Sequence, residues 1–171
     1  TVSKDLTSLY DVVSLFCGAG LFDKSWLDTG KYRFVYANDF SEDVKATYTY
    51  NIGDHLHVKD IRDVKGTELP FADVFLSSPC CQAFSNANRH NINSEESEEK
   101  RLLVEEVVRL VKEAEVKPKV VVVENVPQMI SKEKGLYISK LLNGLPEYES
   151  SVQIVTDYKV HKKCINNVNV I

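Results

Sequence analysis

Two short segments of this chain carry residues that could perform covalent and acid–base chemistry. Cys80 and Cys81 closely follow an apolar run, residues 72–76, that reads as a buried strand and ends in Ser-Ser-Pro. An exposed thiol at such a strand end can act as a nucleophile, although free cysteines are commonly buried in the core. Glu124 follows four valines, and partial desolvation there favours a protonated carboxyl that can act as a general acid. A paired structural glutamate is the alternative. Together the two segments suit thiolate attack on an electron-poor carbon with protonation elsewhere on the ring.

A glycine turn, Cys-Gly-Ala-Gly-Leu at residues 17–21, joins a predicted strand, 12–16, to a predicted helix, 22–29. This order is typical of the start of a nucleotide-binding unit, because glycines let the backbone approach a ligand closely. Asp23 occupies the place of the third glycine of the dinucleotide fingerprint, which disfavours NAD and an oxidoreductase. S-adenosylmethionine has no pyrophosphate and suits the turn better.

Two acids follow further predicted strands. Asp39 comes after the strand at residues 34–37 and lies 21 residues beyond Gly18, which suits hydrogen bonds to ribose hydroxyls. Asp60 comes after the strand at residues 55–58 and suits the adenine amine. Taken singly, each acid could equally be a helix-capping or turn residue.

The elements that must position these residues alternate along the chain. Further helices are predicted over residues 42–51 with Ser41 as N-cap, over 99–115 and over 133–143; further strands are predicted over 120–123 and 151–155. The alternation predicts an α/β fold, a Rossmann-like doubly wound and mainly parallel sheet, with the all-valine strand in its middle. Because parallel strands end at one edge of a sheet, the glycine turn, acids and thiol should share one site there.

Composition limits the remaining possibilities. The 171 residues are 43% hydrophobic and 27% charged, as in a single globular domain, and no apolar run is long enough to cross a membrane. The net charge of −4 lacks the basicity common in nucleic-acid-binding domains. The four cysteines show no metal-ligand spacing, so we expect no metal and a reduced, cytoplasmic location. The polar stretch 85–100 reads as a mobile loop.

Three segments, in this order, resemble those of DNA cytosine C5-methyltransferases: residues 14–20, Ser-Leu-Phe-Cys-Gly-Ala-Gly; residues 78–82, Ser-Pro-Cys-Cys-Gln; and residues 124–126, Glu-Asn-Val. The resemblance covers about residues 11–130 and implies the class I S-adenosylmethionine-dependent methyltransferase fold. It also implies a set of cofactor-binding residues, namely Phe16, Gly18, Ala19, Gly20, Leu21, Asp39, Phe40, Asp60, Ile61 and Leu103.

The same resemblance implies a mechanism. Cys81, as thiolate, would attack C6 of a cytosine flipped out of a DNA duplex, while Glu124 hydrogen-bonds N3 and the exocyclic amine. C5 would then take a methyl group from S-adenosyl-L-methionine. The loop at residues 85–100 would close over the DNA as the catalytic loop, with Ser85, Arg89 and His90 in contact with it. The resemblance also adds the expectation that the protein is associated with the nucleoid.

Departures from the family pattern shape the remaining expectations. Cys80 stands where the family has a second proline, and residues 157–163 begin like its Gln-x-Arg-x-Arg segment but lack the glutamine and arginines. We expect residues 1–171 to form an incomplete catalytic domain, truncated before the target-recognition domain, with 157–171 a degenerate or disordered tail. A second chain would complete the enzyme, as in a divided restriction–modification methyltransferase. A non-catalytic regulatory or partner-binding relative and a tRNA cytosine-5 methyltransferase are the alternatives.

Overall fold

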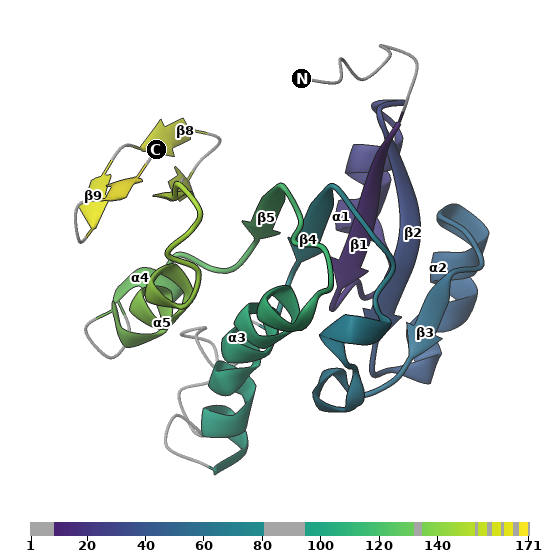
Figure 1. Cartoon of the computed structure of the whole chain (residues 1–171), viewed down its shortest axis with the longest axis horizontal. Helices are drawn as coiled ribbons and strands as arrows, with labels where there is room; N and C mark the ends of the chain where they lie inside the picture. The colour runs from purple at the N-terminus through teal and green to yellow at the C-terminus, as the bar shows by residue number, and fades with distance from the viewer. Residues whose placement is uncertain are drawn as a thin grey trace.

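A computed structural model of the chain describes residues 9–80, 95–131, 135–152, 154–156, 159–161, 163–165 and 168–170 (Figure 1). Its centre is a five-stranded sheet in the order β3-β2-β1-β4-β5, in which every neighbouring pair is parallel. The strands are β1 (Tyr10–Leu15), β2 (Tyr32–Asp39), β3 (Leu56–Val58), β4 (Val74–Ser77) and β5 (Val120–Val123). The predicted parallel α/β sheet is therefore confirmed.

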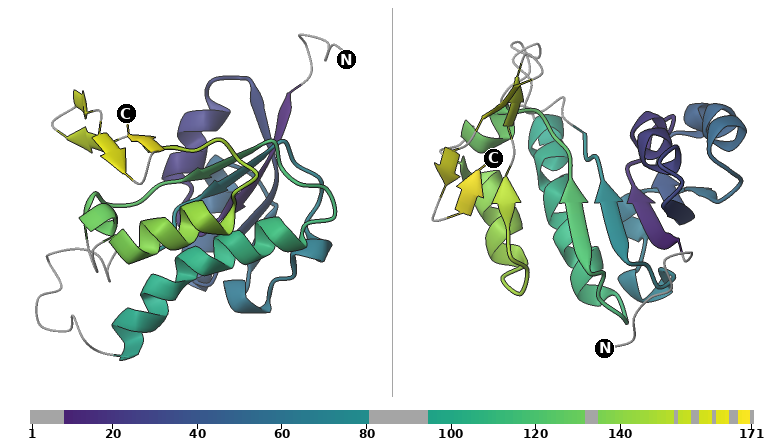
Figure 2. Two further views of the ribbon diagram at one scale, coloured as in Figure 1. Left: turned by 60° about the vertical axis from the view of Figure 1, so that its left-hand side comes forward. Right: turned by 90° about the horizontal axis from the view of Figure 1, so that it is seen from above.

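Helices cover both faces of the sheet, as a doubly wound fold requires (Figure 2). On one face, Val12 and Leu76 pack against Trp26 of α1 (Leu21–Leu27). On the other face, Val13 and Phe75 pack against the apolar side of α3 (Glu95–Glu113). Adjacent residues of one strand point to opposite faces, so the apolar runs of β1 and β4 are explained by burial on both sides.

Helix boundaries differ from the sequence prediction in several places. α1 ends at Leu27, two residues before the predicted end, and the predicted helix 42–51 divides into a 3-10 turn, Glu42–Val44, and α2 (Lys45–Asn51). Ser41 stands at the N-cap of the 3-10 turn but makes no side-chain capping bond. α3 begins at Glu95, so the predicted loop 85–100 is helical from that residue on, and residues 85–94 lie outside the described part.

The carboxyl-terminal region departs most from expectation. Among the described strands, β5 lies at an edge of the sheet rather than in its middle, and Val120 is 47% exposed. After β5 come α4 (Gln128–Ser131) and α5 (Leu136–Gly144), of which the sequence predicted only the second, from residue 133. α5 packs on α3 through a cluster that includes Val104 and Ile138.

The predicted last strand, 151–155, is two short strands that join separate small sheets. β6 (Ser151–Val152) pairs with β10 (Val168–Val170), which also pairs with β9 (Lys163–Ile165), and β7 (Ile154–Thr156) pairs with β8 (Lys159–His161). Three short strands thus lie within residues 157–171, where the sequence predicted a degenerate or disordered tail. No helix in the described part of the chain is long and apolar enough to traverse a membrane.

Candidate active site

The glycine turn follows β1 at the carboxyl edge of the sheet, where all five strands end. Phe16, Gly18 and Gly20 have positive φ angles of 57°, 53° and 84°, so the backbone reverses within a few residues. Gly20 is the N-cap of α1, and its N–H donates to the Cys17 carbonyl at 3.0 Å. A β-carbon on Gly20 would lie 2.9 Å from the Tyr48 ring, whereas one on Gly18 would meet nothing within 4 Å. The turn is therefore tightly packed beneath Gly20 and open at Gly18.

Asp39 holds the second side of the turn. Its carboxylate accepts the Gly18 N–H at 2.8 Å and the Ser41 N–H at 3.0 Å, and the residue is only 9% exposed. The Cys17 N–H donates to the Asn38 carbonyl at 3.0 Å, which ties the turn to the end of β2. The structure thus brings Asp39 to the glycine turn, as the 21-residue spacing predicted.

The next two predicted cofactor residues, Asp60 and Ile61, follow the end of β3. Asp60 follows β3 and caps the 3-10 turn Ile61–Asp63 by accepting the Arg62 N–H at 2.9 Å. The Arg62 guanidinium also pairs with this carboxylate at 2.6 Å, and its hydrogen bonds lower the pKa of Asp60. Ile61 is buried in the core beneath α3, and its carbonyl accepts a hydrogen bond from Arg109. The capping role that the sequence left open is therefore real for Asp60.

Three apolar residues on the predicted list differ in exposure. Leu21 and Phe40 are 86% and 78% exposed and stand immediately after the glycine turn and after Asp39. Leu103 of α3 is half-buried and packs, with Phe16, against the core cluster beneath β1 and β4. Exposed apolar side chains next to a polar, open turn offer contact area to a ligand.

The ends of β4 and β5 are joined by side chains. The Ser78 hydroxyl donates to the Glu124 carboxylate at 2.8 Å, and the Glu124 N–H donates to the Ser77 carbonyl at 2.9 Å. Asn125 Nδ2 donates to the Pro79 carbonyl at 3.0 Å. Glu124 itself is exposed, which corrects the expected desolvation: it leaves the strand at an open edge, not inside a covered sheet. The Ser-Pro-Cys and Glu-Asn-Val segments are nonetheless one structural unit.

Part of the predicted chemistry lies outside the described residues: Cys81, Ser85, Arg89 and His90 all fall there. Cys80, immediately before the predicted nucleophile, is a partly buried free thiol. Cys17 is a buried thiol, and burial, with the Asp23 and Asp39 charges, raises its pKa far above the ordinary value, which makes it unsuited to act as a nucleophile.

A buried polar network beneath the glycine turn was missed by the sequence reasoning. Asp23 is 1% exposed; its carboxylate accepts the Ser14 hydroxyl at 2.8 Å and the Tyr48 hydroxyl at 2.7 Å. Burial raises the pKa of Asp23 to about 6. The sequence does contain one sign of this network, because Asp23 lies one helical turn after Gly20 at a position of α1 that faces the core. The sequence does not show that Tyr48 of α2 is its partner.

The site fits an adenosine cofactor that carries cationic groups. The turn is open above Gly18, the Asp39 carboxylate lies beside it, and Phe40 and Leu21 present apolar surface. No group of three or more potential metal-ligating side chains occurs in the part of the chain that the structure describes.

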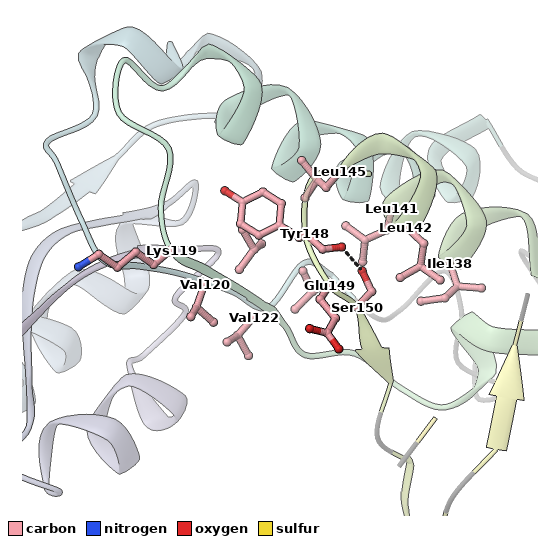
Figure 3. Close-up of a pocket in the computed structure, with 12 residues that line it drawn as sticks. Lys119, Val120, Val122, Ile138, Leu141, Leu142, Leu145, Tyr148, Glu149 and Ser150 are labelled. Atoms are coloured by element: carbon pink, nitrogen blue, oxygen red, sulfur yellow. Dashed lines mark hydrogen bonds between the residues drawn. The ribbon is translucent and has the colours of Figure 1, made fainter. Parts of the chain in front are cut away.

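A cavity of about 530 Å³ lies elsewhere, between the exposed edge of β5 and α5 (Figure 3). Valines 120–123 form one wall, and leucines 141, 142 and 145 with Tyr148 form the other. None of the predicted site residues that the structure describes lines it. This cavity is therefore distinct from the site at the carboxyl edge of the sheet.

Residues 10–166 match the family model of the C-5 cytosine-specific DNA methylase. Among curated proteins, the Type II methyltransferase M.Bsp6I of Bacillus sp. strain RFL6 is 33% identical over 128 residues, which are 74% of this chain and 39% of that protein. The Type II methyltransferase M.HhaI of Haemophilus parahaemolyticus is 30% identical over 95% of this chain and 45% of that protein. The matched part of the chain thus covers less than half the length of each of these relatives.

Solved structures share the fold at low identity. The Entamoeba histolytica methyltransferase EhMeth aligns with a TM-score of 0.62 and 20% identity, over 83% of this chain and 45% of that one. The S. pombe Dnmt2 methyltransferase aligns with a TM-score of 0.59 and 18% identity, over 80% of this chain and 40% of that one. Both likenesses show that the arrangement of strands and helices in this chain also occurs in solved methyltransferase structures.

Proposed function

Because the chain belongs to the C-5 cytosine-specific DNA methylase family, we propose that it forms the cofactor-binding and catalytic part of an enzyme that methylates C5 of cytosine in DNA. One observation carries the proposal: the Ser-Pro-Cys loop and the Glu-Asn-Val segment are fastened together by the Ser78–Glu124 and Asn125–Pro79 hydrogen bonds. These bonds hold the acid beside the loop that leads to Cys81.

In the proposed reaction, the Cys81 thiolate adds to C6 of a cytosine flipped out of the duplex, and a C–S bond forms. Glu124, as the protonated acid, donates its proton toward N3 and accepts a hydrogen bond from the exocyclic amine, which stabilises the negative charge that the addition places on the ring. C5 then takes a methyl group, which S-adenosylmethionine supplies when bound. Loss of the C5 proton to a base and expulsion of the thiolate break the C–S bond and release 5-methylcytosine.

We assign the cofactor to the turn region. The open backbone at Gly18 and the Asp39 carboxylate suit the amino-acid and ribose parts, and the exposed ring of Phe40 offers a face to adenine. Asp60 can serve the adenine amine with whichever lone pairs its pair with Arg62 leaves available. The assigned set is completed by Phe16, Ala19, Gly20, Leu21, Ile61 and Leu103.

The same proposal includes DNA contacts by Ser85, Arg89 and His90. It also includes a second polypeptide that recognises the target sequence. The relatives are named as Type II methyltransferases, and the matched residues cover only 39% and 45% of their lengths, so a further recognition element suits the unmatched part. A net charge of −4 makes basic surface from another segment or chain a useful complement on DNA.

The test uses a duplex oligonucleotide with 5-fluorocytosine at candidate target positions, which blocks proton loss from C5 and so traps the thiolate adduct. The chain, alone and with any polypeptide that copurifies with it, is incubated with the duplex and S-adenosylmethionine. We expect a denaturation-resistant adduct, found by mass spectrometry on residue 81. Cys81→Ser should abolish it and Cys80→Ser should not.

Three outcomes would count against the proposal. Absence of the adduct in every combination favours the non-catalytic alternative, and an adduct with single-stranded RNA but not with DNA moves the substrate to RNA. Adduct formation in Cys81→Ser but not in Cys80→Ser would transfer the nucleophile to the neighbouring thiol.

A further inference from the structure

We propose that Asp23 and Tyr48 are positioning residues for the cofactor, holding the glycine turn in its ligand-binding shape from beneath. The inference rests on the proposed function, since it assigns S-adenosylmethionine to this turn. It concerns residues that need not touch the cofactor, because both side chains are buried, at 1% and 0% exposure.

The Asp23 carboxylate joins three elements around the turn. It belongs to the first turn of α1, it accepts the Ser14 hydroxyl from β1, and it accepts the Tyr48 hydroxyl from α2, at 2.8 and 2.7 Å. The turn itself runs from the end of β1 to the start of α1. One carboxylate therefore fixes both ends of the turn against α2.

Tyr48 transmits this position directly to the turn. Its ring lies so close to Gly20 that a β-carbon there would fall 2.9 Å from one ring carbon and 3.1 Å from another. The ring meets His55 edge to face at 5.5 Å, and its hydroxyl lies 3.2 Å from His55 Nε2. Because the hydroxyl is held by the hydrogen bond to Asp23, the ring has a fixed position and packs directly against Gly20.

The opposite side of the turn is held independently by Asp39, which accepts the Gly18 N–H. Asp39 is also the acid assigned to the ribose, so its contact with the turn can change when the cofactor binds. The contact beneath Gly20 involves no such ligand group. Asp23 and Tyr48 therefore supply the part of the turn's geometry that exists before binding, which lowers the ordering cost of the bound state.

Protonation should act on this arrangement. A carboxylate accepts both hydroxyls, whereas the protonated acid has an O–H of its own to place, so one hydroxyl must reorient. Burial places the pKa of Asp23 at about 6, and the titratable groups that face the network are Cys17, Asp39, Tyr48 and His55. Affinity for the cofactor is therefore expected to fall as the pH drops through this value.

The experiment compares Tyr48→Phe and Asp23→Asn with matched controls on the same helices, Tyr50→Phe and Asp28→Asn. Tyr50 is 90% exposed, and Asp28 caps α1 in an exposed pair with Lys24. Binding of S-adenosylhomocysteine is measured by calorimetry from pH 5 to 8. The Gly18 and Gly20 amide signals are followed by NMR in the ligand-free protein, which gives a readout independent of binding.

We expect Tyr48→Phe to weaken binding about tenfold at pH 7.5, as for one lost hydrogen bond to a charged group. Asp23→Asn should lose the pH dependence near 6, and both variants should move the Gly20 amide signal while the controls do not. Tyr48→Phe removes a single oxygen, so it remains informative even where Asp23→Asn folds poorly.

The outcomes separate this inference from the proposed function. If the wild-type chain binds no S-adenosylhomocysteine, the cofactor assignment fails for this chain, and the glycine amide signals alone decide whether Asp23 and Tyr48 set the turn. If binding, its pH profile and both glycine amides are unchanged in the two variants, the positioning role is wrong. A pH dependence that persists in Asp23→Asn would move the effect to His55 and overturn the role of Asp23.

Discussion

Acidic residues have different partners at the two ends of the strands of the central sheet, which we call its amino edge and its carboxyl edge. At the amino edge, acids pair with cations across strands: Asp73, which is buried, meets Lys119 at 2.7 Å, and Asp11 meets Arg33 at 2.8 Å. At the carboxyl edge, Asp39 accepts two backbone N–H groups, and Glu124 accepts a serine hydroxyl. Asp60, paired with Arg62 in its own 3-10 turn, is the exception.

The difference separates structural acids from candidate functional ones. An acid neutralised by a cation across two strands ties those strands together and has little remaining charge to offer a ligand. An acid held by neutral donors keeps its orientation and is not neutralised by a paired cation, which leaves Asp39 suited to a cationic ligand and Glu124 suited to hydrogen-bonding a base. Changes at the amino edge should therefore alter stability, and changes at the carboxyl edge should alter binding and reaction.

The largest expected effect is at Glu124. Glu124→Gln keeps an oxygen that can accept the Ser78 hydroxyl but removes the ionisable proton, so adduct formation and methyl transfer should fall by about 10²- to 10⁴-fold, the range for loss of a general acid or base. The rates are measured by quenched assays on the 5-fluorocytosine and unmodified duplexes.

Glu147→Gln is the matched control, because Glu147 is exposed and lies beyond α5. Affinity for S-adenosylhomocysteine and the unfolding midpoint should stay at wild-type values in both variants. A Glu124→Gln protein that loses stability but reacts normally would place Glu124 among the structural acids and remove the contrast between the edges.

Much of the fold was predictable because burial on both faces leaves a continuous apolar run in the sequence. β5 was predicted at its observed bounds, and the burial of Val13 and Phe75 follows from the same pattern. The position of β5 in the sheet was not predictable in this way, since four valines suit a central strand and an edge strand beside a helix equally well. α4 was missed because four residues are too few to show helical periodicity.

The part of the site that lies at the carboxyl ends of the strands was predictable from the sequence. Glycines and acids directly after predicted strands came together because the five strands of the central sheet are parallel, as for Gly18 and Asp39. What remained hidden depends on contacts between separate elements: the Tyr48–Asp23 bond spans 25 residues, and Ser78 reaches Glu124 over 46. No local pattern encodes such distances, so the network beneath the turn needed the structure.

The second prediction concerns Asp23, a buried acid near the carboxyl ends of the strands, whose carboxylate accepts the Ser14 and Tyr48 hydroxyls. Burial raises its pKa from 3.8 to about 6, so the native state holds this proton more tightly than the unfolded chain. Its contribution to stability is full below pH 3.8 and is lost as the pH rises to 6, by roughly 3 kcal/mol at most. Asp23→Asn should lack this slope in urea unfolding measured from pH 4 to 7.

Asp28→Asn, on the same helix, should retain the wild-type slope. If the free energy of unfolding of Asp23→Asn changed with pH as it does in the wild type, the Asp23 carboxyl would have the same pKa in the folded and unfolded chain. Asp23 would then be no different from a solvated acid, despite its burial.

The third prediction concerns Asp73 at the amino edge. Asp73→Ala removes the acceptor of the Asp11 N–H and the partner of Lys119, leaving a half-buried donor unsatisfied, so we expect a loss of about 1–3 kcal/mol in the free energy of unfolding. Cofactor affinity should not change. Asp43→Ala, at an exposed acid, should stay close to wild type.

The smallest effect is expected for the exposed pair at the same edge. Arg33 contacts Asp11 through both guanidinium Nε and Nη2, but its side chain is 62% exposed, so water and salt screen the attraction. Arg33→Gln should shift the urea midpoint less than Asp73→Ala. A double-mutant cycle with Asp11→Asn should give a coupling that vanishes in 1 M NaCl. A coupling that survives high salt would mean that the amino edge is held by its surface pairs as firmly as by its buried one, and exposure would no longer explain which acids are structural.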